Sequence, residues 1–317
     1  MTDLELDPRL TDPEAARLVA RARVDAPTTP PVRDAALLAR MRANPSWVRL
    51  PDDDRVLTID GTLPGDPPLA LRLYRPRMGF TGTLLFAHGG GWATGNLETN
   101  DGLCRELARH TGTQVVSLDY RLAPEHPYPA ALHDMWRALV FLASGGGGLV
   151  PDPAALGVAG HSSGGNLAAA LALRSRAGRA PAVRHQLLLC PVLDCDFSRP
   201  SYRECESGLP LNGPDMHWLW DLYVPDGPAR LDPEVSPVRA RELAGSVPAT
   251  IIAAEVDPLR DEAIAYAALL DAAGALEGLI VRPGVPHLFL TWPLSSAVET
   301  LAAIGPGVGA AVAGRAH

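Results

Sequence analysis

The chain has 317 residues, of which 47% are hydrophobic and 20% charged, and its formal net charge at pH 7 is −8. These values are typical of a globular protein with one large domain, or a core with a smaller appendage, and they exclude a disordered chain. All 28 strongly basic residues are arginine, and the acidic excess argues against a nucleic-acid partner.

The first segment and the cysteines bear on the compartment of the protein. The opening MTDLELDPRL has neither a basic region nor an apolar core, so no signal peptide is expected. No uninterrupted apolar run reaches about 18 residues, so no membrane span is expected. No cysteine belongs to a C-x-x-C pair and no Cys/His cluster has metal-ligand spacing, so we expect reduced thiols, no metal site and a cytoplasmic location. The cysteines are Cys104, Cys190, Cys195 and Cys205.

Residues 1–50 are rich in alanine, arginine and leucine, and their apolar residues recur at helical spacing. We therefore predict helices there, with a break at Pro30 and Pro31 because proline cannot continue a helix.

From residue 55 onward the pattern predicts strands. RVLTID (55–60) and LALRLY (69–74) alternate apolar and polar residues and predict a strand pair. Six short apolar runs follow, mostly separated by helix-length segments, which is typical of a parallel sheet covered by helices on both faces. The runs are TLLFA (83–87), QVVSL (114–118), LGVAG (156–160), QLLLC (186–190), TIIAA (250–254) and LIV (279–281). Residues 195–235 break this rhythm and are predicted to be an insertion.

The segment GVAGHSSGGN (157–166) lies between a predicted strand and a predicted helix, and it allows three interpretations. A dinucleotide loop would need G-x-G-x-x-G and an acidic residue about 20 positions later, and a phosphate-binding Walker loop would need a lysine. The segment has none of these. A strand-to-helix turn with a serine cap is the plain structural alternative. The third interpretation is a nucleophile elbow, G-x-S-x-G, with Ser162 at its apex.

The elbow needs partners in a fixed chain order, and the sequence contains candidates for all of them. FAHGGGW (86–92) follows a strand and offers the amides of Gly89 and Gly90, together with that of Ser163, to a developing oxyanion. Asp257 follows TIIAA, and His287 follows LIV. Histidine suits the role of the base because it accepts and returns a proton near neutral pH.

The alternatives for these residues are structural. The glycines can form a plain turn, and Asp257 before proline can be an ordinary turn residue. Asp261 competes with Asp257 but is expected to cap the next helix, and His161 is expected to face away from the site.

With these segments the chain resembles the hormone-sensitive-lipase-like serine esterases, the bacterial family IV carboxylesterases of the α/β-hydrolase fold. The matching segments are HGGGW (88–92), DYRLAPEHPYPA (119–130), GHSSGGNLA (160–168), DPLRDEA (257–263) and GVPHLF (284–289). The resemblance implies a catalytic triad of Ser162, His287 and Asp257. It also implies an oxyanion hole, and hydrolysis of short- to medium-chain carboxylic esters through an acyl-enzyme without a cofactor.

The same resemblance implies a division of the chain. Residues 51–194 and 236–317 would form the α/β-hydrolase core, and residues 1–50 and 195–235 a helical cap over the acyl pocket. The DYRLAPE segment is expected to brace the loop beneath the site through a charged network of Asp119, Arg121 and Glu125.

Substrate contacts and assembly are less determined by the sequence. Trp92, Tyr202 and Trp218, with Trp220, are the large apolar residues nearest the predicted site, and the alternative is that they only pack the cap. By analogy with the resembling enzymes, the strand near 279–281 is expected to pair two subunits. A lactonase, deacetylase or amidase remains an alternative, as does a ligand-binding protein that has lost catalysis, which the complete triad disfavours.

The chain departs from the usual Gly-Asp-Ser-Ala-Gly-Gly pattern of the resembling family at two positions, with His161 in place of aspartate and Ser163 in place of alanine. A backbone amide serves the oxyanion hole, so the change at Ser163 is expected to spare it. Ser163 adds a second hydroxyl beside Ser162, which we still predict to be the nucleophile. The loss of the aspartate is expected to alter the pH optimum or the thermal stability.

Overall fold

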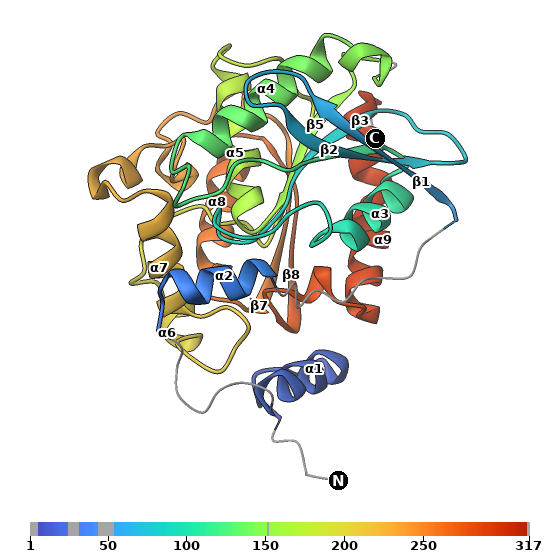
Figure 1. Cartoon of the computed structure of the whole chain (residues 1–317). Coiled ribbons are helices and arrows are strands. Elements are labelled where there is room, and N and C mark those ends of the chain that lie inside the picture. Colours follow the sequence, from blue (N-terminus) through green and yellow to red (C-terminus); the bar gives the residue numbers. More distant parts are fainter. Residues whose placement is uncertain (1–5, 25–31, 44–53, 151, 316–317) are drawn as a thin grey trace.

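The computed structural model describes residues 6–24, 32–43, 54–150 and 152–315. Its centre is an eight-stranded sheet in the order β1-β2-β4-β3-β5-β6-β7-β8, in which β3 to β8 run parallel and β1 and β2 pair antiparallel (Figure 1). The strands are β1 Val56–Leu63, β2 Leu69–Pro76, β3 Thr83–Ala87, β4 Gln114–Leu118, β5 Leu156–His161, β6 Gln186–Leu189, β7 Ala249–Val256 and β8 Leu276–Pro286. The predicted strand pair and parallel sheet are confirmed.

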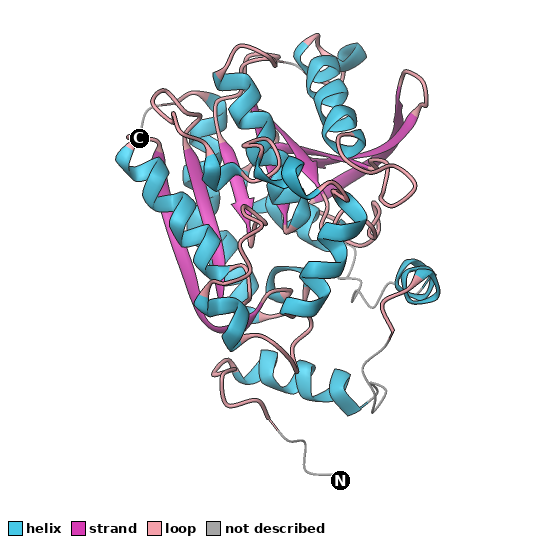
Figure 2. Ribbon diagram, turned by 90° about the vertical axis from the view of Figure 1, so that its left-hand side faces the viewer, coloured by secondary structure: helices cyan, strands magenta, loops and turns pink. Residues whose placement is uncertain are grey.

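Helices cover both faces of the sheet (Figure 2). Every residue of β3, β4, β5 and β6 is buried, as expected for short apolar strands with helices on both sides. Their side chains point alternately into two apolar clusters, so that Leu85 belongs to one and Phe86 to the other. The first cluster includes residues of α4 Ala130–Ala143, α5 Ser163–Arg176 and α8 Arg260–Ala272, and the second includes residues of α1 Pro13–Val24, α3 Asp101–Thr111 and α9 Ser295–Ala313.

Helix α9 is the one helix among the described residues that is long and apolar enough to cross a membrane, with a mean hydropathy of 1.3. A Cβ atom on its Gly305 would lie 2.3 Å from the carbonyl oxygen of His110, and one on its Gly309 would lie 2.0 Å from that of Thr111. These glycines therefore let α9 pack closely on α3 as part of the folded core. The sequence showed no uninterrupted apolar run here because Glu299 lies within the segment.

Short helices occupy the two segments predicted to form the cap. Helices α1, which packs on the second apolar cluster, and α2 Ala35–Ala43 belong to the first segment, and α6 Pro200–Glu204 and α7 Gly213–Tyr223 belong to the second. Leu38 is the buried residue of α2, and Arg33 binds Asp215 of α7 at 2.8 Å. Figure 1 shows α2 beside α7. The predicted break at Pro30 and Pro31 lies outside the described residues, and the proposed domain limits stay a prediction.

The prediction that Asp119, Arg121 and Glu125 of DYRLAPE form one charged network is wrong, because the three side chains have different neighbours. Arg121 forms a bidentate pair with Asp134 of α4, at 2.7 and 2.8 Å. Glu125 binds Arg42 in the last turn of α2 at 2.8 Å. Asp119 is half-buried, and burial raises the pKa of its carboxyl. The pairs attach α4 and α2 to this loop instead of joining the three residues to each other.

Candidate active site

Ser162 occupies the sharp turn between β5 and α5. Its backbone φ is +57°, a left-handed conformation that is strained for a serine. A Cβ atom on Gly160 would lie 2.1 Å from the carbonyl oxygen of Gly164, and one on Gly164 would lie 2.0 Å from that of Ala87. Only glycine fits at both positions, so the G-x-S-x-G spacing is a packing requirement of this turn. The turn places Ser162 at the N-terminus of α5, where the helix dipole favours negative charge.

A chain of hydrogen bonds joins the three predicted triad residues. His287 Nε2 lies 2.9 Å from Ser162 Oγ, and His287 Nδ1 lies 2.7 Å from Asp257 Oδ2. The other carboxylate oxygen of Asp257 accepts the backbone N–H of Leu259 at 2.9 Å, which fixes the carboxylate plane. All three side chains are buried, with 6, 3 and 1% exposure for Ser162, His287 and Asp257. The arrangement can activate a hydroxyl as a nucleophile.

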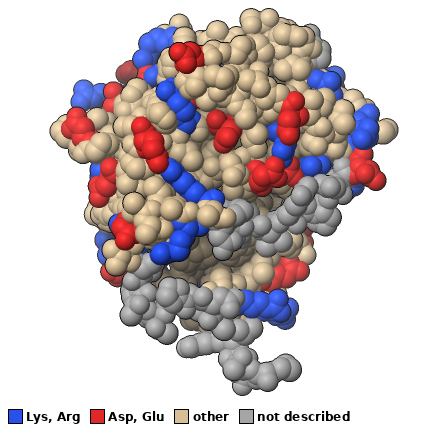
Figure 3. Space-filling view, in the orientation of Figure 1, with Lys and Arg blue, Asp and Glu red and all other residues tan. Residues whose placement is uncertain are grey.

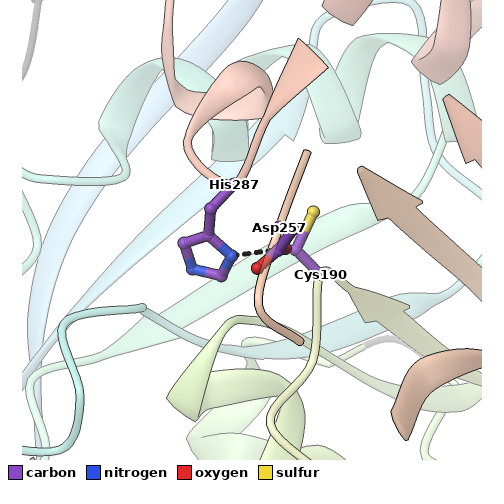
Figure 4. A group of neighbouring side chains, drawn as sticks. All are labelled: Cys190, Asp257 and His287. Atoms are coloured by element: carbon purple, nitrogen blue, oxygen red, sulfur yellow. Dashed lines mark hydrogen bonds and ion pairs between the residues drawn. The ribbon is translucent and has the colours of Figure 1, made fainter. Parts of the chain in front are cut away.

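Cys190 lies behind this chain of hydrogen bonds, and Figure 4 shows its sulfur beside the Asp257 carboxylate. Ligand-type atoms of Cys190, Asp257 and His287 all lie within 4.8 Å of one another. Burial, and then the Asp257 charge, raise the pKa of the Cys190 thiol well above its ordinary value. The neutral thiol is a poor nucleophile and a poor metal ligand. The expected absence of a metal stays a prediction.

The loop after β3 is anchored through its carbonyl groups. Tyr120 Oη donates to the carbonyl oxygen of His88 at 2.8 Å, and the Nδ1 of His88 contacts the carbonyl oxygen of Gly89 at 2.8 Å. The rings of His88 and Tyr120 stack with centroids 4.1 Å apart. In a trans peptide the N–H points opposite to the C=O, so these contacts also fix the amides of Gly89 and Gly90. Within the described residues, neither amide donates to a protein acceptor.

Glycine is required in this loop by close approach. A Cβ atom on Gly89 would lie 3.3 Å from the Cβ of Ser162 and 2.6 Å from His161 Nδ1. Gly90 has a φ of +124°, and its carbonyl accepts the N–H groups of Ala93 and Thr94. The loop therefore lies against the serine with free amides, as an anion-stabilising site requires.

Comparison with known proteins identifies the fold family. A model described as the alpha/beta hydrolase fold matches residues 84–291. The chain belongs to the α/β-hydrolase family. It is 38% identical over 261 residues to an ethyl acetate hydrolase of Pseudomonas putida, a match that covers 80% of this chain and 79% of that protein. It is 36% identical over 304 residues to a carboxylesterase of Mycobacterium tuberculosis, a match that covers 94% of this chain and 89% of that protein.

Solved structures of esterases are similar over nearly the whole chain. A thermostable esterase from Pseudomonas putida superposes with a TM-score of 0.87 at 30% identity, covering 97% of this chain and 99% of that one. A hyperthermophilic esterase from Pyrobaculum calidifontis superposes with a TM-score of 0.76 at 35% identity, covering 87% of this chain and 89% of that one. The resemblance to the hormone-sensitive-lipase-like branch of α/β hydrolases, and the predicted fold class, are confirmed.

His161 and Ser163, the two residues that depart from the usual family pattern, have different surroundings. Ser163 is fully buried, and its hydroxyl, which lies near Tyr120, makes no hydrogen bond within the described residues. Contrary to the expectation from the sequence, His161 does not face away from the site. Its ring centroid lies 5.3 Å from that of His287. The His161 side chain can point in this direction because Gly89, which has no side chain, leaves room for its ring.

The aromatic residues predicted to contact substrate are mainly packed against each other. Trp92 is fully buried, with a φ of +57°, and its ring stacks on that of Tyr223 at 4.3 Å. Tyr202 is buried, and Trp218 is half-buried against the first apolar cluster. These contacts match the packing alternative, and the substrate contacts of the three residues stay a prediction.

Two features of the site were missed or misjudged from the sequence. Asp261 does not cap α8: its carboxylate accepts the N–H of Ser201 at 2.8 Å and so ties α6 to α8. The anchoring by Tyr120 and His88 was not predicted. Its signal was present, since each aromatic ring comes just after a buried parallel strand, where side chains meet at one edge of the sheet.

Proposed function

We propose that this chain hydrolyses carboxylic esters with Ser162 as nucleophile, His287 as general acid–base and Asp257 as the residue that orients and stabilises the histidine. The reaction class follows from the family: the chain is a carboxylic ester hydrolase. The observation that carries the proposed roles is the pair of contacts from His287, 2.9 Å to Ser162 Oγ and 2.7 Å to Asp257 Oδ2.

Acylation begins when Ser162 Oγ attacks the ester carbonyl carbon while His287 Nε2 accepts the hydroxyl proton. The carbonyl oxygen becomes an oxyanion, which the amides of Gly89, Gly90 and Ser163 stabilise by hydrogen bonds. Asp257 stabilises the imidazolium across the short contact to Nδ1. The oxyanion then collapses, the bond to the alkoxy oxygen breaks, and His287 gives its proton to the departing alcohol.

Deacylation repeats these steps with water. His287 Nε2 accepts a proton from water as the water oxygen attacks the acyl carbon. The second oxyanion collapses, Ser162 Oγ leaves and takes the proton from His287, and the carboxylic acid is released. The residues return to their starting protonation states.

The substrate is proposed to be an ester with a short to medium acyl chain. Aromatic residues of the loop after β3 and of α7 pack on one another, as Trp92 does on Tyr223 and Trp220, which supports a small acyl pocket. A relative named for ethyl acetate supports small esters. Lactones, acetylated metabolites and activated amides can react by the same steps and stay alternatives.

The test compares hydrolysis of p-nitrophenyl butyrate by wild type, Ser162→Ala and the matched control Ser163→Ala. Ser162→Ala should lower kcat by roughly 10³-fold or more. Ser163→Ala should keep kcat close to wild type, because the amide and not the hydroxyl serves the oxyanion. A loss below about tenfold in Ser162→Ala would reject this nucleophile.

Assembly and location are part of the proposal. Strand β8 is an edge of the sheet, and its residues Leu279, Ile280 and Val281 are half-buried, which supports a homodimer formed by pairing of β8 strands. A monomer mass by light scattering would reject it. The four cysteines of the described chain are free, which supports a reducing, cytoplasmic compartment.

A further inference from the structure

His161 is a fully buried histidine beside the reacting groups. It is the last residue of β5 and directly precedes Ser162. Its ring lies 5.3 Å from the His287 ring at an interplanar angle of 31°, and its Nδ1 lies 2.6 Å from the point where a Cβ on Gly89 would sit. It therefore contacts the elements that carry both the base and the proposed oxyanion amides.

This histidine is costly for stability. Within the described residues, neither ring nitrogen makes a hydrogen bond of good geometry. The backbone of His287 is close enough to favour the protonated ring, but it does not satisfy the nitrogens. A buried polar group without partners destabilises a fold relative to an apolar residue of similar shape. Such exceptions to the packing rules are expected at functional sites.

The imidazole also carries no charge. Burial, and then the neighbouring His287, lower the pKa of His161 to about 3. Other titratable groups at this edge include His88 after β3, Tyr120 after β4, Cys190 after β6 and Asp257 after β7. Burial raises the pKa of the Tyr120 phenol, which keeps it uncharged. Burial lowers the pKa of His88 to about 4 and raises that of Cys190, so both are uncharged near neutral pH. Asp257 is then the one charged group among these neighbours of the base.

We propose that His161 is a positioning residue that holds His287 and the Gly89 segment in register with Ser162 while placing no charge beside the base. The inference rests on the proposed function, because it requires His287 to act on Ser162. Its ring lies against the segments of His287 and Gly89. The positions of these segments set the distance from the base to Ser162, and the distance from Ser162 to the proposed oxyanion amides.

The test uses four variants of the full-length enzyme: His161→Asn, His161→Leu, His161→Asp, and His185→Asn as a control. His185 is also a fully buried histidine, but it precedes β6 and therefore lies at the amino end of the strand, whereas His161 lies at the carboxyl end of β5. His161→Asn and His161→Leu should lower kcat by about 10- to 100-fold with little change in KM, because small displacements of reacting groups cost rate. His161→Leu should lose activity even if its melting temperature rises. His185→Asn should not lower kcat per active site.

The pH profile of kcat/KM separates positioning from charge. A carboxylate about 5 Å from the His287 ring favours the protonated base, so His161→Asp should move the acid limb to higher pH by about one unit. His161→Asn should leave the acid limb in place. Active-site titration with an organophosphate normalises every rate to folded enzyme.

The outcomes are distinct from those of the proposed function. If Ser162→Ala remains active, the proposed function fails whatever the His161 variants do. If Ser162→Ala is inactive but His161→Asn and His161→Leu keep kcat within twofold per titrated site, only the positioning role is rejected. If no His161 variant folds, or if the acid limb of His161→Asp stays where it is in wild type, the role is structural and the inference is also overturned.

Discussion

Tyr120 donates its hydroxyl proton to the carbonyl oxygen of His88 while its ring stacks on the His88 imidazole, at 2.8 Å and 4.1 Å respectively. One side chain thus fixes the orientation of the peptide between His88 and Gly89, and through it the direction of the Gly89 amide. Tyr120 is also close to the Ser163 hydroxyl, so the loop after β3 and the elbow after β5 share this residue.

The variant Tyr120→Phe keeps the stacked ring and removes the anchor. We expect kcat for p-nitrophenyl butyrate to fall by about tenfold, with KM nearly unchanged, because a looser amide stabilises the transition state less than before. Tyr266→Phe is the control: Tyr266 is equally buried, and its hydroxyl has no hydrogen-bond partner within the described residues. Equal rates for the two variants would show that the anchor has no catalytic effect.

Asp257→Asn tests which acidic residue orients the base. The amide oxygen can still accept the Leu259 N–H, but the amide NH₂ cannot accept a hydrogen bond from His287 Nδ1–H, so the histidine takes the wrong tautomer. We expect kcat to fall by about 10³- to 10⁴-fold. Asp261→Asn should stay within twofold, because Asp261 binds Ser201 and Arg260 instead. The reverse result would exchange the two assignments.

The sequence predicted the sheet, and the meeting of the three proposed triad residues, because both depend on local patterns. Apolar runs mark buried strands, and Ser162, Asp257 and His287 each follow one, so topology alone brings them to one edge. The charge partners of DYRLAPE were not predictable in this way. Arg42 and Asp134 come from distant segments whose packing on Glu125 and Arg121 has no signal in the motif itself.

The orientation of His161 also depended on tertiary packing. A residue before the nucleophile can point to either side of a strained turn, and only the space left by Gly89 decides the side. The packing of Trp92 on Tyr223 joins residues 131 positions apart, from the loop after β3 and from α7. The sequence marked Trp92 as a large aromatic residue near the predicted site but could not distinguish packing from substrate contact.

Helix α2 is expected to depend on ion pairs to an unusual degree. It buries Leu38, and Arg42 in its last turn binds Glu125 and the carbonyl oxygens of Ala93 and Ala123, each at 2.8 Å. Arg42→Ala should speed hydrogen exchange in residues 35–43, as should 1 M salt, because exposed ion pairs are screened. Arg282→Ala removes a comparably exposed pair with Glu299 and should leave α2 exchange unchanged.

The same pair gives a pH dependence with a defined sign. The Arg42 guanidinium lowers the pKa of Glu125 to about 2, from an ordinary value of 4.5. A depressed folded-state pKa contributes stability above the unfolded value, and this stability is lost as the pH falls from about 4.5 to about 2. The difference in melting temperature between wild type and Glu125→Gln should therefore be constant above pH 5 and shrink at lower pH. A difference that grows on acidification would contradict the pairing.

Cys190 should be unreactive although it lies beside the triad. Its thiol is buried, and burial together with the Asp257 charge raises its pKa, so little reactive thiolate forms. Brief treatment of the native enzyme with iodoacetamide should therefore label the half-buried Cys195 before Cys190 and leave esterase activity intact, as read by peptide mass spectrometry and rate. In denaturant both should react. Labelling of Cys190 in the native enzyme, with parallel loss of activity, would instead mean that the thiol behind Asp257 is open to solvent on the timescale of the reaction.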